Sequence, residues 1–258
     1  MKKLLLGNEA VARGLYEAGC RVASSYPGTP STEITEYAAK YEDIYCEWAP
    51  NEKVAMEVAC GAAIAGARSF CAMKHVGLNV ACDPLFTASY TGVNAGMVIA
   101  VADDPGMHSS QNEQDSRHHA QASKTMMLEP SDSAECLAYT KLAYELSEQF
   151  DTPVILRLST RVSHSRSLSE TAERVDNGVK DYVKDPQKYV MMPAMAKGRH
   201  VVVEERFQAE TAWAETASIN TVEYNDTSIG VIASGISYQY AKEALGDRVS
   251  YLKLGCVY

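Results

Sequence analysis

The sequence predicts an α/β fold, a three-layer, doubly wound and mostly parallel sheet that is followed by an incomplete second α/β domain. Between residues 1 and 165, short apolar segments alternate with longer helix-like segments, which is typical of βαβ units. The apolar segments mostly lack polar alternation, as expected of parallel strands covered on both faces. The chain has 258 residues, enough for one large core but few for two complete ones.

The first elements are expected to be a helix, a strand and a second helix. The first helix is predicted over residues 8–18, because Asn8 can cap its start. A strand over residues 21–25 follows it. Thr29 is the expected N-cap of the next helix, residues 30–37, which has proline at its first position.

The rest of the sheet is predicted from five further apolar segments, which brings the total to about six strands. The most distinctive helix spans residues 52–68 and consists mainly of alanine, glycine and cysteine, so it should pack very close to its neighbours. The five strands are expected at residues 44–48, 69–74, 97–102, 125–128 and 154–158.

The chain changes character after residue 165. Residues 167–178 are polar and residues 181–198 lack a clear period, so we expect a linker or wrapping segment before a charged helix over 201–218. A strand, a helix and a strand follow at 229–234, 236–245 and 249–254. Two strands and one helix cannot bury a sheet, so the polypeptide is expected to end inside this second domain. The predicted parts are a first domain, a linker and a second domain at residues 1–165, 166–227 and 228–258.

Composition excludes several classes of function. The net charge of −9 and a pI near 5.2 argue against nucleic acid or an anionic membrane surface as the main partner, since both require basic patches. No apolar run is long enough to span a membrane, and the first seven residues are too short for a signal peptide. The expected location is the cytoplasm.

The cysteines and acidic loops do not predict a metal site. Seven cysteines lie singly, and none forms a C-x-x-C pair, so they are expected to be small core residues. The Asp and His spacing in residues 103–115 fits no standard metal template.

Three loops follow predicted parallel strands and should converge at one edge of the sheet, where α/β proteins bind ligands. Residues 24–32 place several hydroxyl groups beside an expected helix N-terminus, where an anion such as a carboxylate could bind. A β-turn followed by an N-capped helix explains the same residue types without a ligand. Residues 74–80 carry Gly77 at an expected sharp turn and His75, which is either structural or functional. Residues 103–115 form the third loop.

Glu52 opens the small-residue helix. A glutamate in a first turn complements the helix dipole, and that is its simplest interpretation. The small residues behind it would let another backbone or a flat cofactor ring approach, and a carboxylate in such apolar surroundings would suit proton exchange.

Six distinctive motifs follow one another along the first part of the chain. The first is Tyr-Pro-Gly-Thr-Pro-Ser at 26–31, and the others lie at 51–55, 73–80, 101–115, 128–132 and 153–157. Together and in this order, they closely resemble the N-terminal domain of indolepyruvate ferredoxin oxidoreductase α subunits. The resemblance implies an enzyme that uses thiamine diphosphate to decarboxylate arylpyruvates such as indolepyruvate oxidatively to the acyl-CoA, while it reduces ferredoxin. Its chemistry is supplied by the cofactor, with the protein controlling protons and orientation.

The resemblance also implies roles for individual residues. Glu52 matches the glutamate that hydrogen-bonds a ring nitrogen of the aminopyrimidine and activates the cofactor. The residues that match the segment beside the pyrimidine are His75, Val76, Gly77 and Leu78. Thr29, with Pro27 and Gly28, matches the pocket for the substrate carboxylate. Pyruvate-specific relatives carry an arginine where this chain has Ala102, Asp103 and Asp104, which implies a different substrate class.

Other parts of the family's machinery are expected elsewhere. The chain has no Gly-Asp-Gly with a later Asn-Asn for the diphosphate and its Mg²⁺, since residues 246–248 lack the second glycine, and it has no cysteine run for iron–sulfur clusters. The chain alone is therefore expected to be inactive. The implied partners are CoA, ferredoxin, a β subunit and a second copy of the chain. The alternatives are a non-catalytic subunit with a separate thiamine-binding partner, or a related oxidoreductase for pyruvate or another 2-oxoacid.

Overall fold

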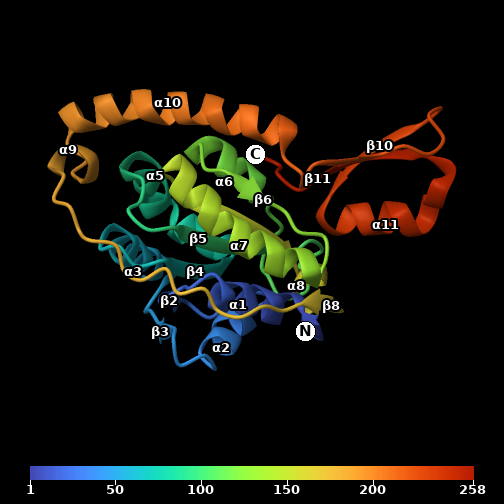
Figure 1. Cartoon of the computed structure of the whole chain (residues 1–258), viewed down its shortest axis with the longest axis horizontal. Helices are drawn as coiled ribbons and strands as arrows, with labels where there is room; N and C mark the ends of the chain where they lie inside the picture. The colour runs from blue at the N-terminus through green and yellow to red at the C-terminus, as the bar shows by residue number, and fades with distance from the viewer.

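A central six-stranded sheet organises the first two thirds of the chain in the computed structural model, which describes all of residues 1–258 (Figure 1). Every neighbouring pair of strands in it is parallel, and the strand order is β3-β2-β4-β5-β7-β6. The predicted α/β fold class is therefore confirmed. The strands are β2 (Val22–Ser25), β3 (Tyr45–Trp48), β4 (Ser69–Lys74), β5 (Met97–Asp103), β6 (Met127–Leu128) and β7 (Val154–Ser159).

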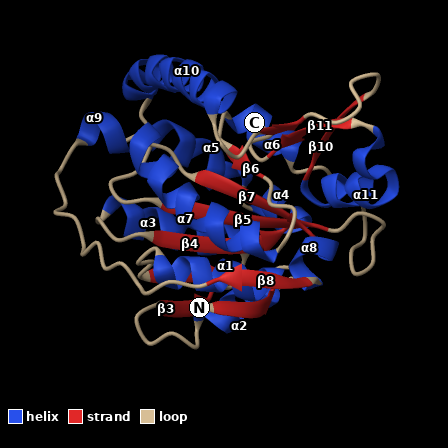
Figure 2. Cartoon of the chain, turned by 45° about the vertical axis from the view of Figure 1, so that its right-hand side comes forward, coloured by secondary structure: helices blue, strands red, loops and turns tan.

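Helices cover both faces of this sheet and make it the middle of three layers (Figure 2). Alternate side chains of β4 and β5 point into two separate apolar clusters, as the period of two along a strand requires. One face carries α1 (Gly7–Glu17), α2 (Thr32–Ala38) and α7 (Ser133–Phe150), and the other carries α3 (Glu52–Ile64), α4 (His75–Val80), α5 (Cys82–Thr91) and α6 (Arg117–Ser123).

The strand order reverses at β2. The chain goes from β2 to its neighbour β3 on one side and then crosses back through α3 to β4 on the other side. In open parallel sheets, ligands bind in the crevice outside the carboxyl ends of the strands at such a reversal. The ends of β2 and β4 therefore mark the first place to look for a site.

Helix α3 lies close to the sheet because three of the four apolar side chains that it buries are alanines, with Met56 as the exception. Ala55, Ala59 and Ala63 are buried, and the Ser69 hydroxyl of β4 donates to the Ala59 carbonyl at 2.7 Å. The helix was predicted to continue to residue 68, but it ends at Ile64 because Gly66 adopts a positive φ of 98°.

An antiparallel pair of strands, β1 (Lys2–Leu6) and β8 (Arg166–Glu170), was not predicted. Strand β8 lies in the segment that was expected to be a linker, and the two strands are far apart in sequence. The start of α1 also differs from the prediction, since Leu6 and not Asn8 is the N-cap. Asn8 is instead buried, and its amide donates to the Pro30 carbonyl at 2.7 Å.

The segment after β8 runs along the surface of the first domain before it forms α9 (Pro186–Tyr189) and α10 (Pro193–Thr216). Its backbone bonds to Glu17 and to Gly66, both at 2.9 Å. The long helix was predicted to begin at residue 201, but it begins at Pro193, where the fixed φ of proline suits a first helical position. The last part of the segment 181–198, which was expected to be a linker, is therefore helical from Pro193.

Buried Arg206 fixes α10 against α5. Its guanidinium donates to the Ser89 carbonyl at 2.8 Å and to the Asp151 carbonyl at 3.0 Å. None of the helices combines the length and apolar character needed to cross a lipid bilayer.

The last part of the chain forms a small sheet with the order β10-β11-β9. Its elements are β9 (Thr221–Glu223), β10 (Gly230–Ser234), α11 (Gly235–Leu245), the short 3-10 helix η1 (Gly246–Arg248) and β11 (Ser250–Leu254). The predicted strand, helix and strand agree with β10, α11 and β11 to within one residue, whereas β9 was missed because it has only three residues. Lys253 of β11 and Glu135 of α7 form an ion pair that joins this small sheet to α7.

Candidate functional site

Glu52 is the first residue of α3 and lies at the carboxyl edge of the sheet. Asn51 caps the helix, with its side-chain oxygen accepting from the Val54 backbone N–H at 3.0 Å. Only 8% of the Glu52 surface is exposed, yet its carboxylate accepts no hydrogen bond from the protein and forms no ion pair. A nearly buried carboxylate without a donor is costly, so this position is suited to a group that the chain itself does not supply.

Gly77 of α4 packs directly against the Glu52 side chain. A Cβ on this glycine would lie 2.5 Å from Glu52 Oε1 and 2.8 Å from its carboxyl carbon. The prediction of a sharp turn at Gly77 was wrong, because His75–Val80 is a helix that follows β4 without a loop and Gly77 does not adopt a positive φ. Glycine is required here because only a hydrogen leaves room for the carboxylate.

The neighbours of Gly77 have different surroundings. His75 is fully buried, and its Nε2 lies 3.0 Å from the Asn112 carbonyl, so this nitrogen carries the proton. Its Nδ1 has no partner in the protein. Leu78 is fully buried in the apolar cluster beneath α3, while Val76 is partly exposed.

The loop that contains Thr29 lies at the end of β2. Thr29 was predicted to cap the next helix, but α2 begins at Thr32 with Ser31 as its N-cap residue. The reason is a turn in which the Ser31 hydroxyl and backbone N–H both donate to the Gly28 carbonyl, at 2.8 and 2.9 Å. Thr29 and Pro27 are exposed at the tip of the loop, so their side chains are free to meet a ligand.

The loops after β2 and β5 meet at the end of β4, so the predicted convergence at this edge is confirmed, although β4 continues into α4 without the expected loop. Lys74 packs its methylenes 3.1 Å from a Cβ built on Gly28, and its ammonium group donates to the Ser109 carbonyl at 3.0 Å. The Ser109 hydroxyl in turn donates to the Thr29 carbonyl at 3.3 Å. The candidate residues at the end of β4 and in the loops after β2 and β5 are thus held in one cluster.

Asp104 fixes the loop that follows β5. One of its oxygens accepts from the Ser109 N–H and the Ser110 hydroxyl, both at 2.8 Å, and the other accepts from the Thr160 hydroxyl at 2.7 Å. Burial by itself would raise the pKa of Asp104, but these donors outweigh it and lower the pKa to about 2. Asp104 is therefore a charged anchor for the loop at neutral pH.

A buried ionic network lies behind that anchor and was not predicted. Arg157 donates to Asp103 at 2.8 Å and to Glu129 at 2.7 Å, and all three residues are buried. Asp103 also accepts from the Ser116 backbone N–H at 3.0 Å, which ties down the far end of the loop. An arginine inside the apolar strand Val-Ile-Leu-Arg-Leu is the signal that could have revealed it, because a buried charge needs a partner.

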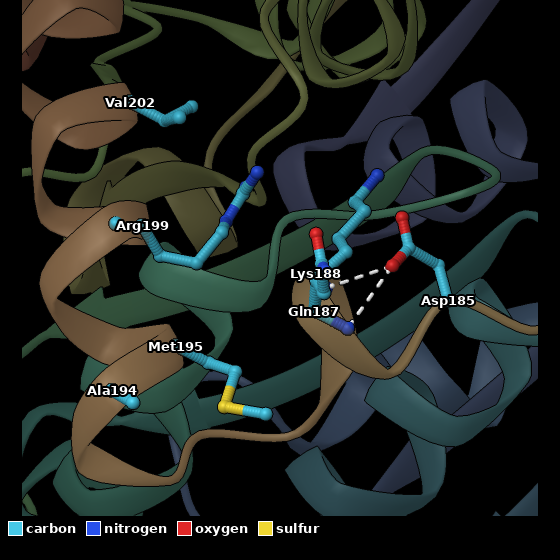
Figure 3. A pocket seen from close by; sticks show the side chains of 8 residues that line it. Asp185, Gln187, Lys188, Ala194, Met195, Arg199 and Val202 are labelled. Carbon is cyan, nitrogen blue, oxygen red and sulfur yellow. Dashed lines mark hydrogen bonds between the residues drawn. The ribbon is translucent and has the colours of Figure 1, made fainter.

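A cavity of about 560 Å³ lies between α9 and α10, away from the residues around Glu52 (Figure 3). Lys188 and Arg199 line it, but they are already engaged. The Lys188 ammonium bonds to the Val93 carbonyl and to Asp151, both at 2.8 Å, and Arg199 bonds to the Tyr90 carbonyl at 2.6 Å. These contacts hold α9 and α10 in place, so the cavity is a feature of packing. No group of three or more His, Cys, Asp or Glu side chains could hold a metal ion.

The substitution Gly77→Ala is expected to displace the Glu52 carboxylate without unfolding the protein. The new methyl group would overlap a side chain that can rotate away, and alanine favours a helix over glycine. The expected shift is about 1 Å, which would bring the new methyl group and Glu52 Oε1 from 2.5 Å to ordinary contact distance. Gly198→Ala in the exposed part of α10 is the matched control, because nothing lies within 4 Å of its Cβ. Crystal structures of the two variants measure this shift, and an unmoved Glu52 carboxylate in Gly77→Ala would show that Gly77 does not set its position.

Comparison with known proteins identifies the family of this chain. Residues 13–229 match the family described as pyruvate flavodoxin/ferredoxin oxidoreductase, thiamine diP-bdg. Over 263 residues the chain is 48% identical to indolepyruvate oxidoreductase subunit IorA of Methanothermobacter marburgensis. This match covers 98% of this chain and 43% of that protein. It is 29% identical over 179 residues to 2-oxoglutarate synthase subunit KorA of Methanothermobacter thermautotrophicus, covering 66% of this chain and 47% of that protein.

A solved structure of 2-oxoglutarate:ferredoxin oxidoreductase from Magnetococcus marinus has a similar fold. Its TM-score is 0.78 at 18% identity, and the match covers 100% of this chain and 54% of that chain. The chain thus spans less than half the length of its indolepyruvate oxidoreductase relatives. The match to the family over most of the chain shows that this protein belongs to the pyruvate flavodoxin/ferredoxin oxidoreductases and contains their thiamine-diphosphate-binding domain.

Proposed function

We propose that this chain is the part of an indolepyruvate oxidoreductase that holds the pyrimidine ring of thiamine diphosphate, with Glu52 as the residue that controls protons on that ring. The observation that carries the proposal is the nearly buried Glu52 carboxylate, which lacks any donor in the protein and packs against Gly77. An unpaired acceptor at this place suits a protonated ring nitrogen, since the hydrogen bond would offset the cost of burial.

The cofactor would supply the carbon nucleophile and the electron sink for decarboxylation of a 2-oxoacid. The chain's own contribution is to orient the ring and to hold or release a proton at the Glu52 carboxylate. Backbone groups around His75 and Val76 are the proposed contacts to the ring, while buried Leu78 supports them from below. His75 is fixed through its bond to the Asn112 carbonyl.

The proposed substrate is an arylpyruvate such as indolepyruvate. The exposed loop of Pro27, Gly28 and Thr29 would meet its carboxylate, held beside Lys74 and Ser109. At the end of β5, Asp103 bonds to buried Arg157 and Asp104 anchors the loop, so this position offers the substrate carboxylate no free arginine. The higher identity to indolepyruvate oxidoreductase subunits than to the 2-oxoglutarate synthase subunit supports this substrate class.

The remaining parts of the activity are proposed to lie outside this chain. CoA would accept the acyl group and ferredoxin the electrons, and Mg²⁺ and iron–sulfur clusters would be held by other segments or by a β subunit. We propose a homodimer as the working form. We also propose that residues 1–165 are the pyrimidine domain, residues 166–227 a linker that covers it, and residues 228–258 the beginning of a second α/β domain.

Two cofactor analogues test the proposal in the intact enzyme. Each replaces one pyrimidine nitrogen of thiamine diphosphate with C–H, so one removes the nitrogen proposed to face Glu52 and the other keeps it. We expect the first analogue to support no measurable ferredoxin reduction with indolepyruvate, and the second to support it. Equal activity with both analogues would contradict proton control by Glu52.

A further inference from the structure

Lys74 brings a positive charge to the ends of β2, β4 and β5 that no carboxylate of the protein neutralises. Its side chain is partly buried, and its ammonium group makes a single hydrogen bond, to the Ser109 carbonyl at 3.0 Å. It forms no ion pair, unlike Lys53 and Arg157 in the same part of the molecule. An ammonium group has three hydrogens to donate, so two remain for a ligand.

The carboxylates of the neighbouring loop are already engaged with other donors. Asp104 accepts from its own loop and from the hydroxyl of Thr160, the first residue of α8 (Thr160–His164). Glu113 accepts from the Gly106 backbone N–H at 2.6 Å. Neither carboxylate forms an ion pair with Lys74, so an anion that enters from solvent meets an unpaired cation there.

Contacts with the loop after β2 hold the stem of Lys74 in place. Its Cδ and Cγ atoms lie 3.1 and 3.2 Å from a Cβ built on Gly28, so the absence of a side chain on this glycine lets the lysine approach. Ser109, which accepts from the ammonium group, also donates through its hydroxyl to the Thr29 carbonyl at 3.3 Å. The charge of Lys74 is therefore fixed beside the exposed tip of the Thr29 loop.

Helix α4 connects this charge to Glu52. Lys74 is the N-cap residue of α4, and Gly77, which packs against the Glu52 carboxylate, lies three positions later. Three residues of a helix span roughly 5 Å along its axis. In a 2-oxoacid the carboxylate is bonded directly to the carbon that reacts, so a cation for it must lie close to the reacting centre. Lys74 and Glu52 meet this requirement because one helical turn connects them.

We propose that the Lys74 ammonium group binds the carboxylate of the 2-oxoacid substrate. The inference rests on the proposed function, because it places a 2-oxoacid at the Thr29 loop. Arg157, the arginine nearest in sequence to the end of β7, is occupied by Asp103 and Glu129, and Lys74 supplies the charge in its place.

The ion pair with Lys74 acts on substrate binding more than on the rate of the chemical step. The carboxylate is fully charged when the substrate binds, and it loses that charge as CO₂ departs. An interaction that is weaker in the transition state than in the bound substrate lowers KM without raising kcat. Lys74 is therefore expected to set the affinity for the 2-oxoacid.

Steady-state kinetics of the intact enzyme with indolepyruvate and ferredoxin test the proposal. We expect Lys74→Gln to raise the KM for indolepyruvate about tenfold and to leave kcat within about twofold of the wild type. Lys74→Arg keeps the charge and should recover most of this loss. The matched control is Lys53→Gln, which makes the same charge change at a lysine that pairs with Asp83 at 2.9 Å, and it should leave KM unchanged.

Ionic strength separates a charge pair with the substrate from a purely structural role of Lys74. The wild-type KM should rise with added salt and that of Lys74→Gln should not, because salt screens the attraction. A lysine that only braced the loop at Ser109 would not produce this difference. An unchanged KM in Lys74→Gln, or an equal rise in Lys74→Gln and Lys74→Arg, would overturn the proposal.

A measurement without substrate distinguishes failure of this inference from failure of the proposed function. The rate of proton exchange at the thiazolium carbon of bound thiamine diphosphate should be the same in Lys74→Gln and in the wild type. If Glu52→Gln slows this exchange while KM does not respond to Lys74→Gln, the role of Lys74 is refuted and the role of Glu52 stands.

Discussion

Replacement of Glu52 with glutamine is expected to lower ferredoxin reduction by the intact enzyme about 10²- to 10⁴-fold, the usual contribution of a positioned acid or base. Glutamine keeps the size of the side chain, so it should fit between α3 and Gly77. Glutamine cannot take up a proton, however. Its NH₂ group would also face a ring nitrogen that is itself protonated and needs an acceptor. Turnover at saturating indolepyruvate is the quantity to measure.

The matched control is Glu57→Gln on the same helix. Glu57 is half exposed and lies 3.9 Å from Lys53, a surface pair that contributes little to stability. Its replacement should leave turnover within about twofold of the wild type. If the two variants lost activity equally, the loss would arise from general damage to α3.

Arg157→Met is expected to destabilise the protein by about 3–5 kcal/mol, because it leaves buried charges without a partner. Asp103 and Glu129 are both buried and both bond to this guanidinium. The loop that follows Asp103 should also loosen, since Asp103 holds the Ser116 N–H at its far end. Urea unfolding of the intact protein measures the change in free energy.

Arg117→Met provides the comparison for this variant. Arg117 pairs with Asp115 at 2.8 Å in a partly exposed position, so the same substitution should cost about 1 kcal/mol or less. Addition of Glu129→Gln to Arg157→Met should recover part of the loss by removing one unpaired charge. Equal losses for the Arg157 and Arg117 variants would mean that the buried network does not stabilise the fold.

The parallel sheet could be predicted because its information is local. The central strands β4, β5 and β7 are short, mostly apolar segments that are buried on both faces, and each is bounded by polar or turn residues. The pairing of β1 with β8 could not be predicted in this way. Leu4 and Leu168 are exposed, so their strands lack the buried alternation that identifies a strand.

The candidate site could be predicted only in part. The convergence of the ends of β2, β4 and β5 at one edge follows from the parallel topology, and Glu52 could be identified at a helix start beside small residues. Gly77 is needed because its backbone packs against the side chain of Glu52, which lies 25 positions earlier in the chain. The sequence alone indicated a turn at this glycine and not this contact. Thr29 lost its predicted capping role because Ser31 competes for the same turn. Such choices depend on tertiary contacts that no local pattern contains.

The most direct test of the central claim is the rate at which the reactive thiazolium carbon of bound thiamine diphosphate exchanges its proton for deuterium. It can be measured by quenched-flow NMR of the intact enzyme without substrate. If Glu52 controls protons on the pyrimidine ring, Glu52→Gln should slow this exchange at least about 10²-fold, while Glu57→Gln leaves it unchanged. Exchange at the wild-type rate in fully loaded Glu52→Gln enzyme would contradict the proposed role of Glu52.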